Sequence, residues 1–256
     1  MLRRLRFIEA RILPRGWRDV LKQVTLFLAA YVLYQVVRGL IDDGSAYKPF
    51  GDAMRIIDLE RVLHVFAEPS IQAWALNKRW LMDFADWTYL NAHYLVTLGA
   101  LVFIYLRRNA SFYFVRNMFM IAMAIALVGY AIYPTAPPRL MPEWGFTDSI
   151  SQFLGTPVDY GPGKDLLNFY AAVPSMHVCF ALMIGVPMTR LVKRWPAKIA
   201  WSLYPLLITF VVVATGNHYF TDVFLGGVTA AISALLAKRL LARARPDSWA
   251  FGGVTA

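Results

Sequence analysis

The chain has 256 residues, of which 58% are hydrophobic and 16% charged, and its mean hydropathy is +0.47. Soluble domains contain about 45–50% apolar and about 25% charged residues, so this composition excludes a soluble globular fold, and a disordered chain would be more polar still. The formal charge is +10, but the basic residues lie between apolar segments and not along one face, which argues against a nucleic-acid partner. The single cysteine, Cys179, excludes a disulfide framework and a cysteine-based zinc site. A membrane-embedded protein remains.

Six segments are candidate membrane spans, each near the length of about 20 apolar residues that a bilayer requires. In chain order they are residues 20–41, 81–106, 112–133, 175–191, 199–214 and 220–240. The second is polar in its first half, and the fourth and fifth are short. We predict an all-α polytopic membrane protein with about six transmembrane helices.

Two segments between the spans are too long to be simple turns. Residues 53–66 are amphipathic and are predicted to lie on the outer membrane surface or to fold back over the bundle. Their apolar residues are Met54, Ile57, Leu59, Val62, Leu63 and Phe66, among the polar Arg55, Asp58, Glu60 and Arg61. Residues 134–173 form a long outer loop rich in proline and glycine, and such loops tend to be functional.

These segments divide the chain into three parts. Residues 1–80 hold the N-terminal arm, the first span and the amphipathic segment, residues 81–245 form the membrane core, and residues 246–256 are a C-terminal tail. Lysine and arginine predict the orientation, because they are enriched in cytoplasmic loops. With the N-terminus inside, 18 of the 26 basic residues are cytoplasmic. Both termini are therefore expected in the cytoplasm.

Three polar stretches interrupt the apolar pattern, at residues 133–139, 172–177 and 215–222. In the predicted topology all three lie at the outer ends of spans three to six, which indicates one site on the outer face. His218 and Asp222 are four residues apart, which predicts that both lie on the same face of a helix beginning near His218 and can contact each other. The carboxylate would fix the imidazole tautomer and leave the other ring nitrogen as a nucleophile or base. The alternative is a polar pair that merely holds helices together.

His177 is predicted in the first turn of the fourth span, because Pro174 stops any preceding helix and Ser175 is a good N-cap. A helix start presents unpaired N–H groups and suits a phosphate. Arg139 follows a proline-rich helix end and can bind phosphate through its planar fork of donors, although it could instead extend to lipid headgroups. Lys164 is a weaker second candidate cation.

The motifs Pro174-Ser-Met-His177 and His218-Tyr-Phe-Thr-Asp222 resemble the second and third signatures of the type-2 phosphatidic acid phosphatase superfamily, which has a six-helix core. Two features are more similar to the aureobasidin-sensitive inositol phosphorylceramide synthases, namely the proline-rich stretch after Tyr133 and the His218-Tyr219 pair. The His218-Tyr219 pair is also similar to sphingomyelin synthases. The resemblance covers residues 133–227. It implies that His218 becomes a phosphohistidine, that Asp222 orients it, and that His177 protonates the leaving oxygen.

The chain departs from the superfamily signatures at several phosphate-binding positions. Val212 stands where the third signature has arginine. Around Arg139, Tyr133 replaces the lysine and Leu140 the proline of the first signature. At least two cations are missing. This loss favours a phosphodiester, with one negative charge, over a phosphomonoester, with about −1.5 to −2; the alternative is that Lys164 or another basic residue replaces the missing charge.

Three hypotheses for the function follow. The first is a lipid head-group phosphotransferase that acts on a lipid phosphate or phospholipid, with an alcohol such as inositol as a possible acceptor and no cofactor. The second is a lipid or polyprenyl phosphate phosphatase, in which water is the acceptor. The third is a transporter or scaffold without catalysis. Two histidines and one aspartate could also form an open zinc site, but the helix start and Arg139 favour an anion.

The orientation can be tested with reporter fusions. Fusions near Arg108 and Lys193 should report a cytoplasmic location and fusions near Gly155 an external one, because basic residues flank the first two sites. An external C-terminus would contradict the predicted number of spans.

Overall fold

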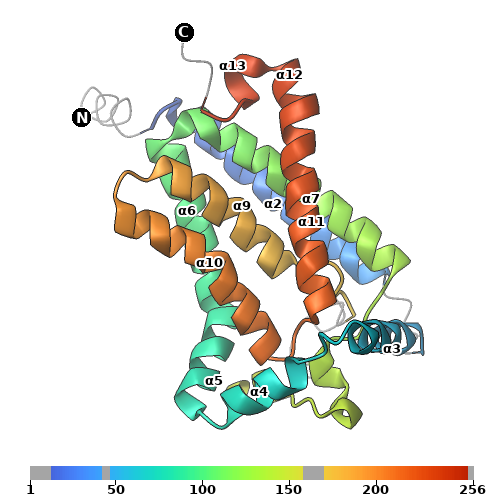
Figure 1. Ribbon diagram of the computed structural model, residues 1–256. Coiled ribbons are helices and arrows are strands. Elements are labelled where there is room, and N and C mark those ends of the chain that lie inside the picture. Colours follow the sequence, from blue (N-terminus) through green and yellow to red (C-terminus); the bar gives the residue numbers. More distant parts are fainter. Residues whose placement is uncertain (1–12, 42–46, 158–169, 253–256) are drawn as a thin grey trace.

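The computed structural model describes residues 13–41, 47–157 and 170–252, and these residues form a bundle of helices (Figure 1). The predicted all-α membrane fold is confirmed. Within the described residues, five helical stretches are long and apolar enough to cross a membrane, at Gly16–Val37, Arg79–Arg107, Asn109–Ile132, Trp195–Ala214 and Phe220–Ala244. They correspond to α2 (Gly16–Ile41), α5 to α6, α7 (Asn109–Ile132), α10 (Trp195–Ala214) and α11 (Phe220–Leu236) with its extension. The fourth predicted span is the shorter helix α9 (Met176–Leu191).

The second span is polar in its first half, where Asp86 and His93 face inward but Asp83 and Asn91 are exposed. It consists of α5 (Arg79–Trp87), a π-helical turn (Thr88–Ala92) and α6 (His93–Arg107). Asp86 is buried and accepts a hydrogen bond from the Ser149 hydroxyl at 2.8 Å. The buried His93 lies 2.9 Å from the Tyr204 hydroxyl through Nδ1. Burying a polar group is costly unless it finds such a partner, so these contacts reconcile the composition with a membrane helix.

Helix α9 lies at the centre of the bundle and contacts α6, α7, α10 and α11. Its buried side chains Cys179, Met183 and Ile184 belong to the main hydrophobic core, together with the small Ala122 and Ala126 of α7. Any residue at the start of α9 is therefore surrounded by four other helices, which fixes its position.

Helix α2 packs mainly along α7 and is held at both ends by hydrogen bonds. Near its start, Asp19 accepts hydrogen bonds from Tyr105 at 2.9 Å and Tyr113 at 2.6 Å. Near its other end, the Tyr34 hydroxyl donates to the Tyr130 hydroxyl at 3.2 Å. Most of its apolar side chains remain exposed, including Leu33, as expected for a helix that faces lipid.

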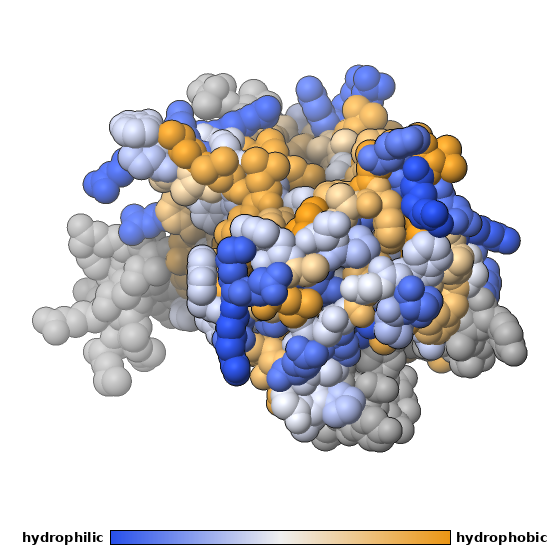
Figure 2. Space-filling view, turned by 60° about the horizontal axis from the view of Figure 1, so that its bottom comes forward, coloured by the Kyte–Doolittle hydropathy of each residue, from blue (hydrophilic) through white to orange (hydrophobic). Residues whose placement is uncertain are grey.

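The start of α2 lies at the same end of the bundle as α13 (Pro246–Trp249) and the turn between α6 and α7 (Figure 1). The opposite end carries α3 (Tyr47–Val62), α4 (Glu68–Leu76), α5 and the short helix α8 (Ser149–Leu154). Figure 2 looks toward that end and shows hydrophilic side chains gathered over it, with hydrophobic ones beyond. Which compartment this end faces stays a prediction.

The amphipathic segment is helical, but its buried face differs from the prediction. Ile56, Ile57 and Glu60 are buried, whereas Leu59 and Val62, expected on the apolar face, are exposed. The reason is that α3 folds back over the start of α11, where the Glu60 side chain accepts a hydrogen bond from the Thr221 N–H. The hydrophobic pattern alone could not reveal this, because it assigned the carboxylate to the polar face.

The first described part of the long outer loop, residues 134–157, is fastened to α4 and α5. It contains α8 and two 3-10 turns, Pro138–Leu140 and Pro142–Trp144. The Gln72 side chain donates to the Thr147 carbonyl at 3.0 Å and accepts from the Thr147 N–H at 2.9 Å. These bonds hold the loop beside the end of α10 and the start of α11.

A glycine allows α11 to pass very close to the start of α9. A Cβ atom on Gly226 would lie 2.4 Å from the Ser175 carbonyl oxygen, whereas one on the neighbouring Gly227 would lie 3.7 Å from Leu182. We expect Gly226→Ala to destabilise the protein by about 1–3 kcal/mol, the usual cost of overpacking. Gly227→Ala is the matched control and should unfold like the wild type in thermal melts of the purified protein. Equal melting of the two variants would contradict this close contact.

Candidate functional site

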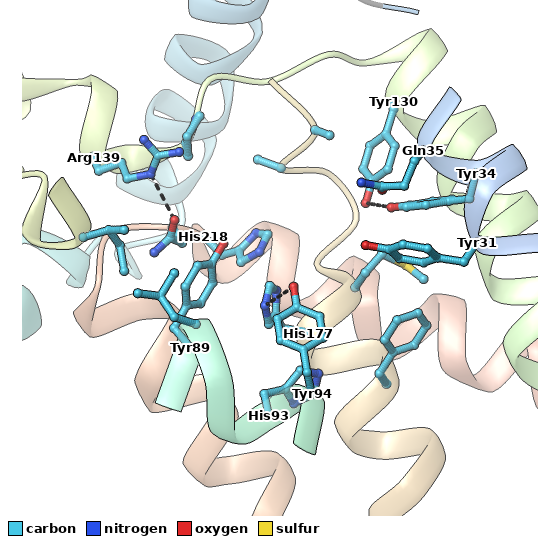
Figure 3. A pocket seen from close by; sticks show the side chains of 18 residues that line it. Tyr31, Tyr34, Gln35, Tyr89, His93, Tyr94, Tyr130, Arg139, His177 and His218 are labelled. Carbon is cyan, nitrogen blue, oxygen red and sulfur yellow. Dashed lines mark hydrogen bonds between the residues drawn. The ribbon is translucent and has the colours of Figure 1, made fainter. Parts of the chain in front are cut away.

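The three polar stretches predicted from the sequence meet at one cavity of about 310 Å³ (Figure 3). Arg139 comes from the stretch after α7, His177 from the start of α9, and Asn217 and His218 from the turn before α11. The other walls come from α2, α7 and the second span. The structure thus brings His177, His218 and Arg139 together, as the sequence predicts.

His218 and Asp222 form a pair at the start of α11. The helix begins at Phe220, with Tyr219 as its N-cap, so His218 lies just before the helix and not on its face as the spacing suggested. Contact is still made because the Asp222 side chain points back. Its Oδ2 atom accepts from the Tyr219 N–H at 3.0 Å and lies 3.3 Å from His218 Nδ1. Asp222 is fully buried. Because its carboxylate contacts Nδ1 of His218, the other ring nitrogen, Nε2, remains for chemistry.

His177 lies in the first turn of α9, as predicted. Ser175 is the N-cap, with its hydroxyl 3.5 Å from the Val178 N–H. The His177 ring stacks on Tyr89 at 4.4 Å between centroids, and its Nε2 atom lies 3.4 Å from the Tyr94 hydroxyl. Its centroid is 6.0 Å from that of His218. The two imidazoles therefore lie near each other in the same cavity.

Arg139 is held beside His218, the candidate nucleophile, by the two residues that precede His218 in the chain. Its Nε–H donates to the Asn217 side-chain oxygen at 3.0 Å, and its backbone N–H donates to the Gly216 carbonyl at 2.7 Å. Nη1 lies 3.9 Å from an Asp148 oxygen. The guanidinium is mostly buried and faces the cavity. Arg139 and His218 therefore form one unit that could bind a phosphate and attack it.

The remaining predicted residues have different positions. Ser175 is buried and serves as the N-cap of α9, and its side chain does not line the cavity. Lys164 lies outside the described residues. Val212, which replaces the third-signature arginine, is packed in an apolar cluster of α9 and α10, so no cation enters from that position.

The sequence did not identify several residues that surround His177. Tyr89, His93 and Tyr94 come from the π-helical turn and the start of α6, and all three line the cavity. The signal in the sequence was the polar first half of the second span. In the structure this half contains a π-helical turn, and such turns occur frequently at functional sites. As for the zinc hypothesis, no group of three potential metal ligands occurs among the described residues, and His218 and Asp222 contact each other.

Two buried glutamates accept hydrogen bonds at the start of α11. The sequence analysis did not identify either of them as part of the site. Glu68 Oε1 accepts from the Phe220 N–H at 2.8 Å, and Glu60 Oε1 accepts from the Thr221 N–H at 2.7 Å. Together with Asp222 they satisfy the first N–H groups of the helix, which would otherwise lack partners. Burial, reinforced by the neighbouring Glu60 carboxyl, raises the pKa of Glu68 to about 8.

Comparison of the sequence with protein-family models identifies the family of the chain. A model described as the PAP2 superfamily matches residues 54–237, which include the three polar stretches and both histidines. No curated protein and no solved structure matches the chain. The chain belongs to the PAP2 superfamily, whose members are phosphatases or phosphotransferases. This membership confirms the superfamily resemblance and favours an enzyme over a transporter or scaffold.

The protonated Glu68 predicts a pH dependence of stability. In the folded state the pKa of Glu68 is about 8, whereas its ordinary value is 4.5. The contribution of Glu68 to the free energy of unfolding is therefore fully present below pH 4.5 and is lost as the pH rises toward 8. We expect Glu68→Gln to reduce the fall in melting temperature between about pH 5 and pH 8, because the amide stays neutral. The exposed Glu143 provides the control, and Glu143→Gln should keep the wild-type slope. An unchanged slope for Glu68→Gln would show that the carboxyl is ionised.

Proposed function

We propose that this PAP2 superfamily member is a lipid head-group phosphotransferase, which moves a phosphoryl-containing group from a phospholipid to an alcohol through a phosphohistidine at His218. The observation that carries the proposal is the arrangement of His218, His177 and Arg139 around one cavity. His218 is oriented by Asp222 at 3.3 Å, His177 stands across the cavity from it, and Arg139 is attached to Asn217 beside it.

In the first step, His218 Nε2 attacks phosphorus and a P–N bond forms. The bond from phosphorus to the leaving alcohol oxygen breaks, and its electron pair stays on that oxygen, which takes a proton from His177. Asp222 stabilises the positive charge that develops on the His218 ring, as an orienting carboxylate does in other histidine-based sites. Arg139 holds the non-bridging oxygens with charge-assisted hydrogen bonds.

In the second step, the acceptor hydroxyl gives its proton to His177, now a base, and its oxygen attacks phosphorus. The P–N bond breaks, and both histidines return to their starting protonation states. The same histidine serves as acid and then as base, because the second step is chemically the reverse of the first with a different alcohol.

A phosphodiester is favoured as substrate by the charge of the cavity. Arg139 is the one lysine or arginine that lines it among the described residues. A phosphodiester carries one negative charge and a phosphomonoester about −1.5 to −2, so a single guanidinium matches the diester better. This balance, together with the similarity to inositol phosphorylceramide synthases, supports transfer to an alcohol such as inositol. The site is proposed to open on the outer face of the membrane.

Substitution of the two histidines tests their separate roles. His218→Ala should abolish phosphoenzyme formation from every substrate, because no other group is proposed to attack phosphorus. His177→Ala should lose about 10²–10⁴-fold in rate on a lipid, the usual contribution of a general acid. On a nitrophenyl ester, whose leaving group hardly needs a proton, His177→Ala should form phosphoenzyme far faster than His218→Ala.

Folding of both variants is checked by thermal melts, and phosphoenzyme formation is measured with labelled substrate. A folded His218→Ala protein that keeps a tenth of the wild-type activity would eliminate the covalent mechanism. Incubation of labelled phospholipid with and without inositol then distinguishes transfer from hydrolysis. Vanadate should inhibit both reactions, because it mimics five-coordinate phosphorus.

A further inference from the structure

The cavity continues beyond the histidines into a second compartment, whose chemistry the proposed reaction does not yet use. Arg139 and His218 lie at one end, His177 and Tyr94 in the middle, and the second compartment at the other end (Figure 3). We call this end the α2 arm and define it by Tyr31, Tyr34 and Gln35 of α2 and Tyr130 of α7.

We propose that the α2 arm binds an uncharged group that carries several hydroxyls, such as a polyol or a sugar, next to the reacting phosphate. This inference rests on the proposed function for the position of the phosphate. Its ligand is either a soluble acceptor alcohol or the head group of the phospholipid, and both present the same chemistry to the arm.

The side chains of the arm favour such a ligand. Three phenol hydroxyls and one amide can each donate and accept hydrogen bonds, which matches the hydroxyl groups of a polyol. Tyr34 and Tyr130 already form a hydroxyl pair at 3.2 Å, and the aromatic faces can cover the C–H groups of a ring. No described carboxylate lines the cavity. A cationic head group is therefore less well matched, although tyrosine faces alone could attract one.

The position of Gln35 provides a second line of support. A polar side chain within a membrane span is expensive and marks a functional site by default. The Gln35 amide is half-buried, lines the cavity, and has no hydrogen-bond partner among the described residues. The neighbouring Leu33 and Val36 are exposed apolar residues. A ligand in the arm would supply the missing partner.

The location of α2 indicates that the arm serves substrate selection and not the common chemistry. The family model begins at residue 54, after the end of α2 at Ile41. Tyr31, Tyr34 and Gln35 thus come from a helix outside the matched region, whereas His177, His218 and Arg139 lie within it. The Tyr94 hydroxyl, 3.4 Å from His177 Nε2, stands between the two ends. An alcohol in the arm would therefore share one cavity with the histidine that is proposed to exchange protons with it.

The test compares Tyr34→Phe and Gln35→Leu with the matched control Tyr105→Phe. The control also removes one tyrosine hydrogen bond between α2 and the bundle, but at the opposite end, where Tyr105 contacts Asp19. Binding of labelled myo-inositol to the detergent-solubilised full chain is measured by equilibrium dialysis. Phosphoenzyme formation is measured with phosphatidylinositol, phosphatidylethanol and phosphatidylcholine.

If the ligand is a soluble acceptor, the wild type binds inositol saturably, and each arm variant weakens binding about fivefold, the effect of one hydrogen bond. If the ligand is the lipid head group, free inositol does not bind, but the wild type prefers phosphatidylinositol to phosphatidylethanol, and the arm variants lower that ratio by a similar factor. The control should match the wild type in both assays.

The proposal is overturned if the wild type neither binds inositol nor prefers phosphatidylinositol, if it prefers phosphatidylcholine, or if the control behaves like the arm variants. Failure of the proposed function gives a different result. No lipid would then form phosphoenzyme, while inositol binding would still decide whether the arm exists.

Discussion

The start of α11 is the constraint on which the rest of the site depends. A helix that begins inside a bundle has N–H groups without partners, and leaving them unpaired in apolar surroundings is costly. Here three carboxyl groups satisfy them, Asp222 from the helix itself and Glu60 and Glu68 from α3 and α4. These bonds attach the outer helices to α11. They also fix the residue immediately before the helix, His218, whose orientation the proposed chemistry requires.

Arg139 would extend this constraint to the phosphate of the proposed substrate. Its hydrogen bonds reach Asn217 and the Gly216 carbonyl, the two residues before His218, so cation and nucleophile are positioned by the same short turn. Gln72 and Asp86 hold the adjoining loop from the other side. The charge surplus of the chain contributes little here, because Arg139 is the one lysine or arginine among the described residues of the cavity.

How much could be predicted from the sequence depended on whether the signal was local. Pro174 and Ser175 mark a helix start by their own backbone preferences, and His218 and Asp222 are close enough in the chain to be recognised as a pair. Glu60 was assigned to a polar surface because its burial depends on α11, 161 residues away. Gln35 is a local signal because it is polar within an apolar span, but Tyr31 carries none, and the pattern of the span does not reveal which side faces a cavity.

The division between local and distant signals coincides with a division of roles. The residues that are proposed to perform the chemistry lie in short motifs within the matched region 54–237, because a nucleophile, an acid and a cation must keep fixed mutual distances. Helix α2 has fewer constraints, since it packs mainly on α7 and exposes most of its apolar surface. Its cavity-facing positions can therefore change without disturbing His177 or His218. A helix attached in this way is well suited to determine which alcohol reaches the phosphate while the reaction itself stays the same.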